Sequence, residues 1–233
     1  MTMRMKILLT NDDGIDAPGL GALAVAANRL GGEAVVVAPA EPHSGCGHRV
    51  TTEGPLAAVA VGPGRFRVHG TPADCVRLGL ARLVPDAVLV LSGINAGGNL
   101  GADVHRSGTV AAAREAALHG RPAVSASLYR RRRSATDWER PSGWLADLLV
   151  TLWDRPLQPG EFWNVNLPDL DLAAPPPPVV ECDVDPSPFA LDYRLGDDGW
   201  HYSAGYHDRQ RVPGGDVDVC FSGRIALSRL RVV

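Results

Sequence analysis

Two adjacent aspartates near the start of the chain carry more negative charge than their local structure needs. Asp12 and Asp13 follow the apolar stretch 7–10 and precede Gly14, where an expected strand turns into an expected helix. A turn needs one Asn or Asp and a Gly, and Asp16 can cap the helix that follows. The pair is therefore expected to do chemistry, and two adjacent carboxylates would repel each other unless a cation lay between them.

Two later segments are also rich in glycine and small polar residues, and each follows an expected strand. Residues 39–52 offer the hydroxyl of Ser44, and residues 92–109 offer the side-chain amides of Asn95 and Asn99. Carboxylate, hydroxyl and amide oxygens suit Mg²⁺, Mn²⁺ or Ca²⁺ better than zinc. These residue types therefore predict a divalent-metal site.

The second of these segments ends in Ser107, Gly108 and Thr109, at the start of a helix expected over 107–120. Free N–H groups and the helix dipole make a helix start attractive to anions, and Gly108 would let a phosphate approach the backbone closely. A metal held by carboxylates and facing such a helix start is typical of phosphoryl transfer. Each motif is weak alone, so the interpretation depends on the segments converging.

The elements that must position these segments alternate between strand and helix. Nearly continuous Val and Leu runs separated by helices predict an α/β core with a mainly parallel sheet covered on both faces. Ligands bind outside the carboxyl ends of the strands in such sheets, so the polar segments should meet at one edge. The expected strands are 6–10, 34–39, 86–93, 122–128 and 161–168, with more β structure within 54–70, and the expected helices are 18–30, 72–84, 107–120 and 142–153.

Residues 171–233 differ in composition from the catalytic α/β core expected over residues 1–170. Four consecutive prolines, 175–178, stiffen a connector, and 196–208 and 216–233 read as hairpin material without helix signals. We expect this region to be a C-terminal β-arm or hairpin that packs on the core or on a partner subunit.

Composition and charge exclude several classes of protein. A formal net charge of −3 argues against binding of a nucleic-acid polymer, and the basic cluster 129–141 lacks a ladder of aromatic residues and is expected to be a solvated loop. The four cysteines show no zinc-site spacing, no apolar run approaches the length of a membrane span, and the N-terminal residues do not read as a signal peptide. We therefore expect a cytoplasmic protein that neither spans nor binds a membrane.

The motifs described above resemble those of the SurE family, the stationary-phase survival proteins that act as 5′/3′-nucleotidases. The resemblance implies a Rossmann-like three-layer α/β/α sandwich, with a C-terminal β-hairpin arm commonly exchanged between the subunits of a homodimer or homotetramer. The stretches that carry it are "ILLTNDDGIDAPGL" (7–20), "HSGCGHRVT" (43–51), "GTPADCVRLGL" (70–80) and "SGINAGGNLGADVHRSGTVAAAREA" (92–116), with weaker similarity at 164–169 and 214–230.

The resemblance also implies a reaction and a set of metal ligands. Family members are divalent-metal-dependent phosphomonoesterases, usually of nucleoside monophosphates. One Mg²⁺ or Mn²⁺ per subunit is expected, and Ca²⁺ can occupy the same oxygens. The residues that match the family's metal ligands are Asp12, Asp13, Ser44 and Asn95.

We expect Asn99, Ser107, Gly108 and Thr109 to hold the phosphate of the substrate. The sequence leaves the general base open between Asp12 and a hydroxide on the metal, with a covalent aspartyl-phosphate as a less favoured variant. The preferred ester, Mg²⁺ against Mn²⁺, and dimer against tetramer also stay open.

The chain departs from the family pattern at three positions near the expected site. Ala102 stands where an acid is frequent, Arg106 where tyrosine is frequent, and His43 where a basic residue often precedes the metal-site serine. These differences bear on substrate preference and rate, and Ala102 and Arg106 support one alternative, a nucleotide-binding or sensing module without turnover. A Rossmann-type dehydrogenase is disfavoured, because no G-x-G-x-x-G follows the first expected strand.

Overall fold

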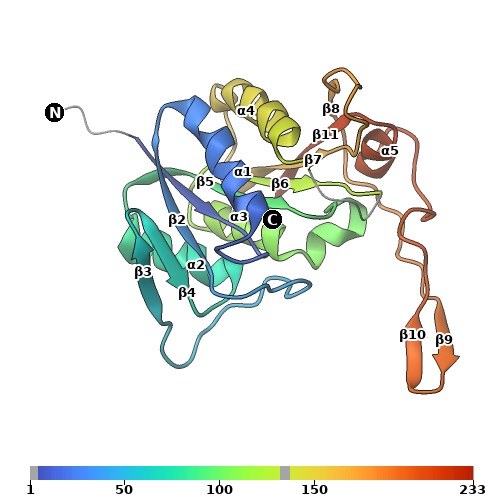
Figure 1. The fold of residues 1–233 in the computed structure, drawn as a ribbon, viewed down its shortest axis with the longest axis horizontal. Helices are drawn as coiled ribbons and strands as arrows, with labels where there is room; N and C mark the ends of the chain where they lie inside the picture. Colours follow the sequence, from blue (N-terminus) through green and yellow to red (C-terminus); the bar gives the residue numbers. More distant parts are fainter. Residues whose placement is uncertain (1–4, 132–136, 233) are drawn as a thin grey trace.

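A computed structural model describes residues 5–131 and 137–232, so residues 132–136 of the basic cluster lie outside the described residues. Within these ranges the centre of the molecule is a nine-stranded sheet in the order β3-β4-β2-β1-β5-β6-β7-β11-β8 (Figure 1). Neighbouring strands are parallel from β4 to β7 and between β11 and β8, whereas the β3–β4 and β7–β11 pairs are antiparallel. The expected α/β fold with a mainly parallel sheet is confirmed.

The strands of this sheet are β1 (Lys6–Thr10), β2 (Glu33–Pro39), β3 (Ala58–Gly62), β4 (Arg65–Val68), β5 (Ala87–Asn95), β6 (Ala123–Leu128), β7 (Glu161–Leu167), β8 (Val179–Glu181) and β11 (Ile225–Arg231). A separate antiparallel hairpin consists of β9 (Tyr193–Gly196) and β10 (Gly199–Tyr202). The α-helices are α1 (Pro18–Ala27), α2 (Pro72–Leu78), α3 (Gly108–Leu118), α4 (Glu139–Trp153) and α5 (Asp216–Phe221), joined by the shorter η1 (Asn28–Leu30), η2 (Gly79–Leu83) and η3 (Gly101–His105).

Helices cover both faces of the sheet because side chains of the central strands point alternately to either side. Ile7 and Leu9 of β1 belong to the apolar cluster under α1 and α4, whereas Leu8 belongs to the cluster under α2 and α3. On β7, Trp163 and Phe162 divide in the same way. Burying such a side chain stabilises the fold by about 1.5–3 kcal/mol, which makes the central strands a rigid support for the loops at their ends.

The chain changes direction at β1, in the middle of the sheet. From β1 it passes through α1 to β2 and then to β4 on one side, and after α2 it returns to β5 on the other side of β1. The loops that follow β1 and β5 therefore lead away in opposite directions and leave a crevice between them. In parallel α/β sheets this is the place where ligands bind.

The C-terminal region adds to the sheet as well as forming an arm. β8, α5 and β11 lie against the main sheet, and the β9–β10 hairpin projects away from the rest of the molecule (Figure 1). The expectation of hairpin structure over 216–233 is wrong at α5, where a short helix precedes β11. The alternating pattern of this segment resembles a strand, but Asp216 accepts hydrogen bonds from the amides of Gly101 and Asp185, and these distant contacts favour the helix.

Asp16 does not have the capping role expected from the sequence. The N-cap of α1 is Ala17, followed by Pro18, and no side chain caps the helix. Asp16 instead pairs with Arg67 of β4 at 3.1 Å. Because neither Asp12 nor Asp13 caps α1, their charge remains unexplained by local structure.

None of the helices in the described ranges is both long and apolar enough to cross a membrane.

Candidate functional site

The loops that follow β1, β2 and β5 meet at the carboxyl edge of the sheet, as the sequence predicts. The backbone amide of His43, after β2, donates to the carbonyl of Asp12 at 2.7 Å. The amide of Ala96, after β5, donates to Oδ2 of Asp13 at 3.2 Å. The loop after β1 therefore holds both neighbouring loops through the adjacent aspartates.

Asp12 lies beside the start of α3, and both its carboxylate and the first turn of the helix are buried. Thr109 is fully buried and donates from Oγ1 to Oδ1 of Asp12 at 2.5 Å. Burial raises the pKa of Asp12 to about 6, with a further contribution from the charge of Asp13, while the Thr109 hydrogen bond opposes the rise. A cation beside the pair would offset the charge that burial disfavours.

Gly108, the first residue of α3, has no room for a side chain. A Cβ at this position would lie 2.8 Å from Cβ of Asp12 and 2.9 Å from Sγ of Cys46, closer than packed side chains allow. Gly108 therefore lets Asp12 and the loop after β2 approach the start of α3. The side chains of Asp12 and Cys46 lie where a side chain at this position would extend, and the approach of a phosphate to this backbone stays a prediction.

Ser107 is the N-cap of α3, as its position in the sequence suggests. Its Oγ accepts a hydrogen bond from the amide of Val110 at 3.0 Å. The preceding carbonyl, of Arg106, accepts from the amide of Gly47 at 3.0 Å, which attaches the loop after β2 to the start of the helix. The Ser107 side chain thus occupies the Val110 amide, and the Thr109 amide lies against the Asp12 carboxylate, so an anion at this helix start would share the first-turn amides with side chains of the protein itself.

The remaining oxygens of the expected ligand set fit a hard divalent cation. Asn95 donates from Nδ2 to the carbonyl of Gly97 at 2.7 Å, which leaves its Oδ1 as an acceptor. Asp13 is half-buried with a raised pKa, chiefly because of burial, and Ser44 is exposed next to His43. In the part of the chain that the structure describes, no three His, Cys, Asp or Glu side chains form a metal cluster. Any cation here would need the hydroxyl and amide oxygens as well as the two carboxylates.

Asn99 is held in place by a buried network of polar side chains. Its amide donates to Oδ1 of Asn166 at 2.8 Å, and its carbonyl accepts from Nδ2 of both Asn164 and Asn166 at 3.0 Å. Its side chain donates from Nδ2 to Oγ of Ser127 at 2.8 Å, which leaves one amide hydrogen for a ligand. Sequence reasoning gave no role to the strand asparagines, although two asparagines at positions i and i+2 of a buried strand must share one face.

The C-terminal segment packs against the loop after β5. Arg209 pairs with Asp103 at 2.7 Å, and the hydroxyl of Tyr206 donates to the same carboxylate at 3.1 Å. Arg106, one of the departures from the family pattern, stacks on the ring of Phe189, with its guanidinium carbon 3.8 Å from the ring centroid. No local pattern predicts these contacts, because their partners are more than 80 residues apart along the chain.

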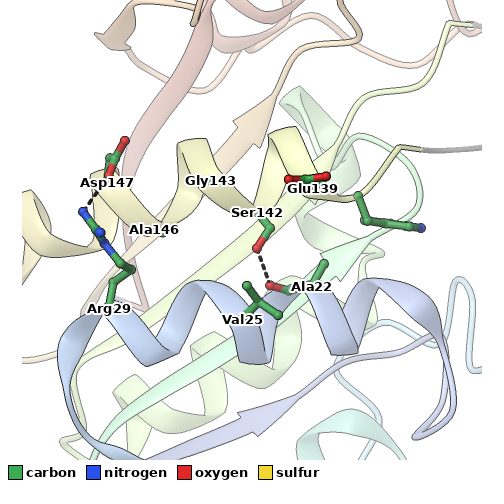
Figure 2. A pocket seen from close by; sticks show the side chains of 9 residues that line it. Ala22, Val25, Arg29, Glu139, Ser142, Gly143, Ala146 and Asp147 are labelled. Carbon is green, nitrogen blue, oxygen red and sulfur yellow. Dashed lines mark hydrogen bonds and ion pairs between the residues drawn. The ribbon is translucent and has the colours of Figure 1, made fainter. Parts of the chain in front are cut away.

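A groove of about 550 Å³ between α1 and α4 lies away from this loop cluster (Figure 2). Three of its polar side chains are engaged: Ser142 donates to the carbonyl of Ala22, and Arg29 pairs with Asp147. The groove therefore offers few free polar groups, and the loop cluster remains the candidate site.

Comparison with known proteins agrees with this geometry. The family described as "Survival protein SurE" matches residues 7–181. A protein from Nostoc sp. (strain PCC 7120) whose name includes 5′-nucleotidase is 49% identical over 98% of this chain and 100% of its own length. The "5′-nucleotidase SurE" of Citrifermentans bemidjiense is 45% identical over 76% of this chain and 71% of its own.

A solved structure supports the same assignment. The crystal structure of the SurE protein from Aquifex aeolicus superposes with a TM-score of 0.85 at 30% sequence identity, covering 98% of this chain and 94% of that one. The family match covers the loops after β1, β2 and β5, where the candidate site lies. The chain belongs to the SurE family.

Proposed function

We propose that the protein is a divalent-metal-dependent phosphomonoesterase that hydrolyses nucleoside monophosphates. The observation that carries the proposal is the contact of Asp12 with Thr109 at the start of α3, next to Asp13, which is bound by the loop after β5 at the carboxyl edge of the sheet. Relatives named 5′-nucleotidase support the class of reaction. The pairing of an acidic cation site with an anion-accepting helix start is what phosphate-ester hydrolysis requires.

In this proposal, Asp12, Asp13, Ser44 and Asn95 hold one Mg²⁺ or Mn²⁺ per subunit, and Ca²⁺ can take the same oxygens. A metal bound there would act as a Lewis acid on the phosphate and lower the pKa of water. The hydrogen bonds between the loops would hold the ligand oxygens and their negative charge in place around such an ion.

The phosphate is proposed to lie at the first turn of α3, near Thr109 and the free amide hydrogen of Asn99. Asp12 is a candidate proton acceptor, because burial raises its pKa to about 6. Thr109 orients this carboxylate, and the close packing of Gly108 against Asp12 holds it at the start of α3.

The test is phosphate release from p-nitrophenyl phosphate and from a panel of nucleoside 5′- and 3′-monophosphates. Each assay runs with EDTA, Mg²⁺ or Mn²⁺, on wild type, Asp12→Asn and Asp13→Asn. Asp16→Asn is the matched control, since it removes a nearby exposed carboxylate that lies outside the proposed ligand set. We expect metal-dependent release that both site variants lose and the control keeps.

Other outcomes have distinct meanings. Nucleotide binding without release under any metal would favour the sensing module over the enzyme. Release that survives EDTA and both site variants would show that the chemistry uses other residues. Circular dichroism of each variant separates a lost site from a lost fold.

We also propose that the β9–β10 hairpin joins subunits into a homodimer or homotetramer. Leu195, Trp200, Tyr193 and Tyr202 of the hairpin are all exposed in the single chain, with Leu195 and Trp200 at 68% and 69%. Apolar surface of this kind is stabilised when a partner covers it. Light scattering after gel filtration should give a smaller mass for Leu195→Asp with Trp200→Asp than for wild type, and an unchanged mass would contradict the proposal.

A further inference from the structure

A second groove, distinct from the candidate site, lies at the far end of α3. Its volume is about 550 Å³, and it is formed by the C-terminal ends of α2 and α3, η2 and the loop after residue 50. α3 has 11 residues, so the groove lies about 16 Å along the helix from the proposed phosphate position. The two places are therefore too far apart to share one small ligand.

Three arginines and a histidine from separate segments line this groove. Arg77 comes from α2, Arg82 from η2, His119 from the end of α3, and Arg121 from the residues before β6. In the described ranges Arg82 makes no ion pair or side-chain hydrogen bond, and the one hydrogen bond of the Arg121 side chain is to the carbonyl of Pro85 at 3.5 Å. Most of the guanidinium donors in the groove are thus unused.

The carboxylates near these cations already have partners. Asp74, the one acid that lines the groove, accepts hydrogen bonds from the amide and hydroxyl of Thr51 and from the amide of Thr71. Glu115, behind the groove wall, lies 2.9 Å from His119 and 3.6 Å from Arg77. The contacts with Glu115 hold Arg77 and His119 in position without involving Arg82 or Arg121.

Apolar side chains complete the wall of the groove. Leu56, Leu78 and Leu80 lie beside the guanidinium groups. Arginine matches phosphate oxygens with paired N–H donors, and an apolar wall suits the organic part of a ligand. The groove has three guanidinium groups for one carboxylate, in a protein whose overall charge is negative.

We propose that this groove is a second binding site, for small anions that carry a diphosphate group. Arg82 and Arg121 supply the free donors, Arg77 adds positive charge, His119 lines the groove beside them, and the leucines contact any organic portion. The proposal is independent of the reaction at the carboxyl edge of the sheet, since it uses none of that site's residues.

The test is NMR of the ¹⁵N-labelled full chain in EDTA, titrated with inorganic pyrophosphate and, separately, with ADP. We expect saturable shifts of the backbone amides that line the groove. Arg82→Gln with Arg121→Gln should raise the dissociation constant read from these signals at least about tenfold, because two charge-assisted contacts are lost. Arg194→Gln with Arg231→Gln removes the same charge elsewhere and should leave it within about twofold.

Three results would overturn the proposal. The first is no saturable shift in the groove signals with pyrophosphate, even if the signals of the first turn of α3 move. The second is equal weakening by the control pair, which would indicate general attraction of anions. The third is a groove response to ADP alone, which would show that the diphosphate is not the group recognised. Equal responses to the two probes would support recognition through the diphosphate itself.

Discussion

Replacing Asn166 by leucine tests whether the buried asparagine network positions the loop that carries Asn99. Leucine has a similar volume but removes the acceptor for the Asn99 amide and one of two donors to the Asn99 carbonyl. A buried N–H left without a partner costs about 1–3 kcal/mol, and a lost hydrogen bond about 0.5–1.5 kcal/mol. We therefore expect Asn166→Leu to lower the free energy of unfolding by about 2–4 kcal/mol.

Asn164→Leu is the matched control, because it leaves no polar group of the network without a partner. The Asn99 carbonyl keeps its bond from Asn166, and the hydroxyl of Ser125 keeps its bond to the carbonyl of Trp163. The expected cost is about 0.5–1.5 kcal/mol. A difference of about 2 kcal/mol between the variants corresponds to about 4–8 °C in Tm for a chain of this size.

Thermal and urea unfolding of the metal-free protein measure both variants, and phosphate release measures the effect on the loop. The Asn166 variant should also lose more kcat/KM, since Asn99, which Asn166 holds, is one of the proposed phosphate residues. Equal Tm values for the two variants, or a Tm of Asn166→Leu at the wild-type value, would refute the reasoning.

Three further predictions concern α3 and the carboxylate at its start. Thr109→Val should lower kcat/KM by about 10- to 100-fold, because a hydrogen bond to a charged group contributes about 1.5–3 kcal/mol, whereas Thr109→Ser should keep most of the activity. Gly108→Ala should displace Asp12 or Cys46 and reduce metal affinity by calorimetry, and unchanged affinity would count against the close contact. Burial alone would raise the pKa of Glu115, but the two histidine rings bonded to it outweigh burial and lower that pKa below 4.5. The stabilising contribution of Glu115 is therefore present above pH 4.5 and is lost as the pH falls through the lowered pKa. Urea unfolding between about pH 6 and 3 should therefore show a smaller loss of stability in Glu115→Gln than in wild type, and parallel losses would contradict this assignment.

The sequence predicted the central sheet because its strands are buried on both faces and carry continuous apolar runs. Such runs need no knowledge of distant partners, and β1, β2, β5, β6 and β7 all lie within two residues of their expected bounds. The convergence of the polar loops followed from the same pattern, since parallel strands place their carboxyl ends on one edge. The ligand set and the exchanged arm, by contrast, came from the family resemblance.

Features that depend on contacts across the chain were not predictable. Asp16 reads as a helix cap but pairs with Arg67, because β4 runs past the start of α1 in the folded chain. The segment that forms α5 alternates like a strand and becomes helical where Asp216 binds two distant amides. The close approach of Asp12 and Cys46 to Gly108 gives this position a need for glycine that the sequence pattern did not predict.

The position of Ser44 depends on α3 as much as on the strand that precedes it. Residues 40–57 form no helix or strand, so the order of this loop must come from tertiary contacts. The amide of Gly47 donates to the carbonyl of Arg106, the residue before the N-cap of α3. The ring of His48 lies 2.7 Å from the carboxylate of Glu115, two turns further along the helix. Because the loop is attached at two points on one rigid element, it cannot rotate about either contact alone. Substitutions along α3 that spare every proposed ligand should therefore still change metal binding through Ser44.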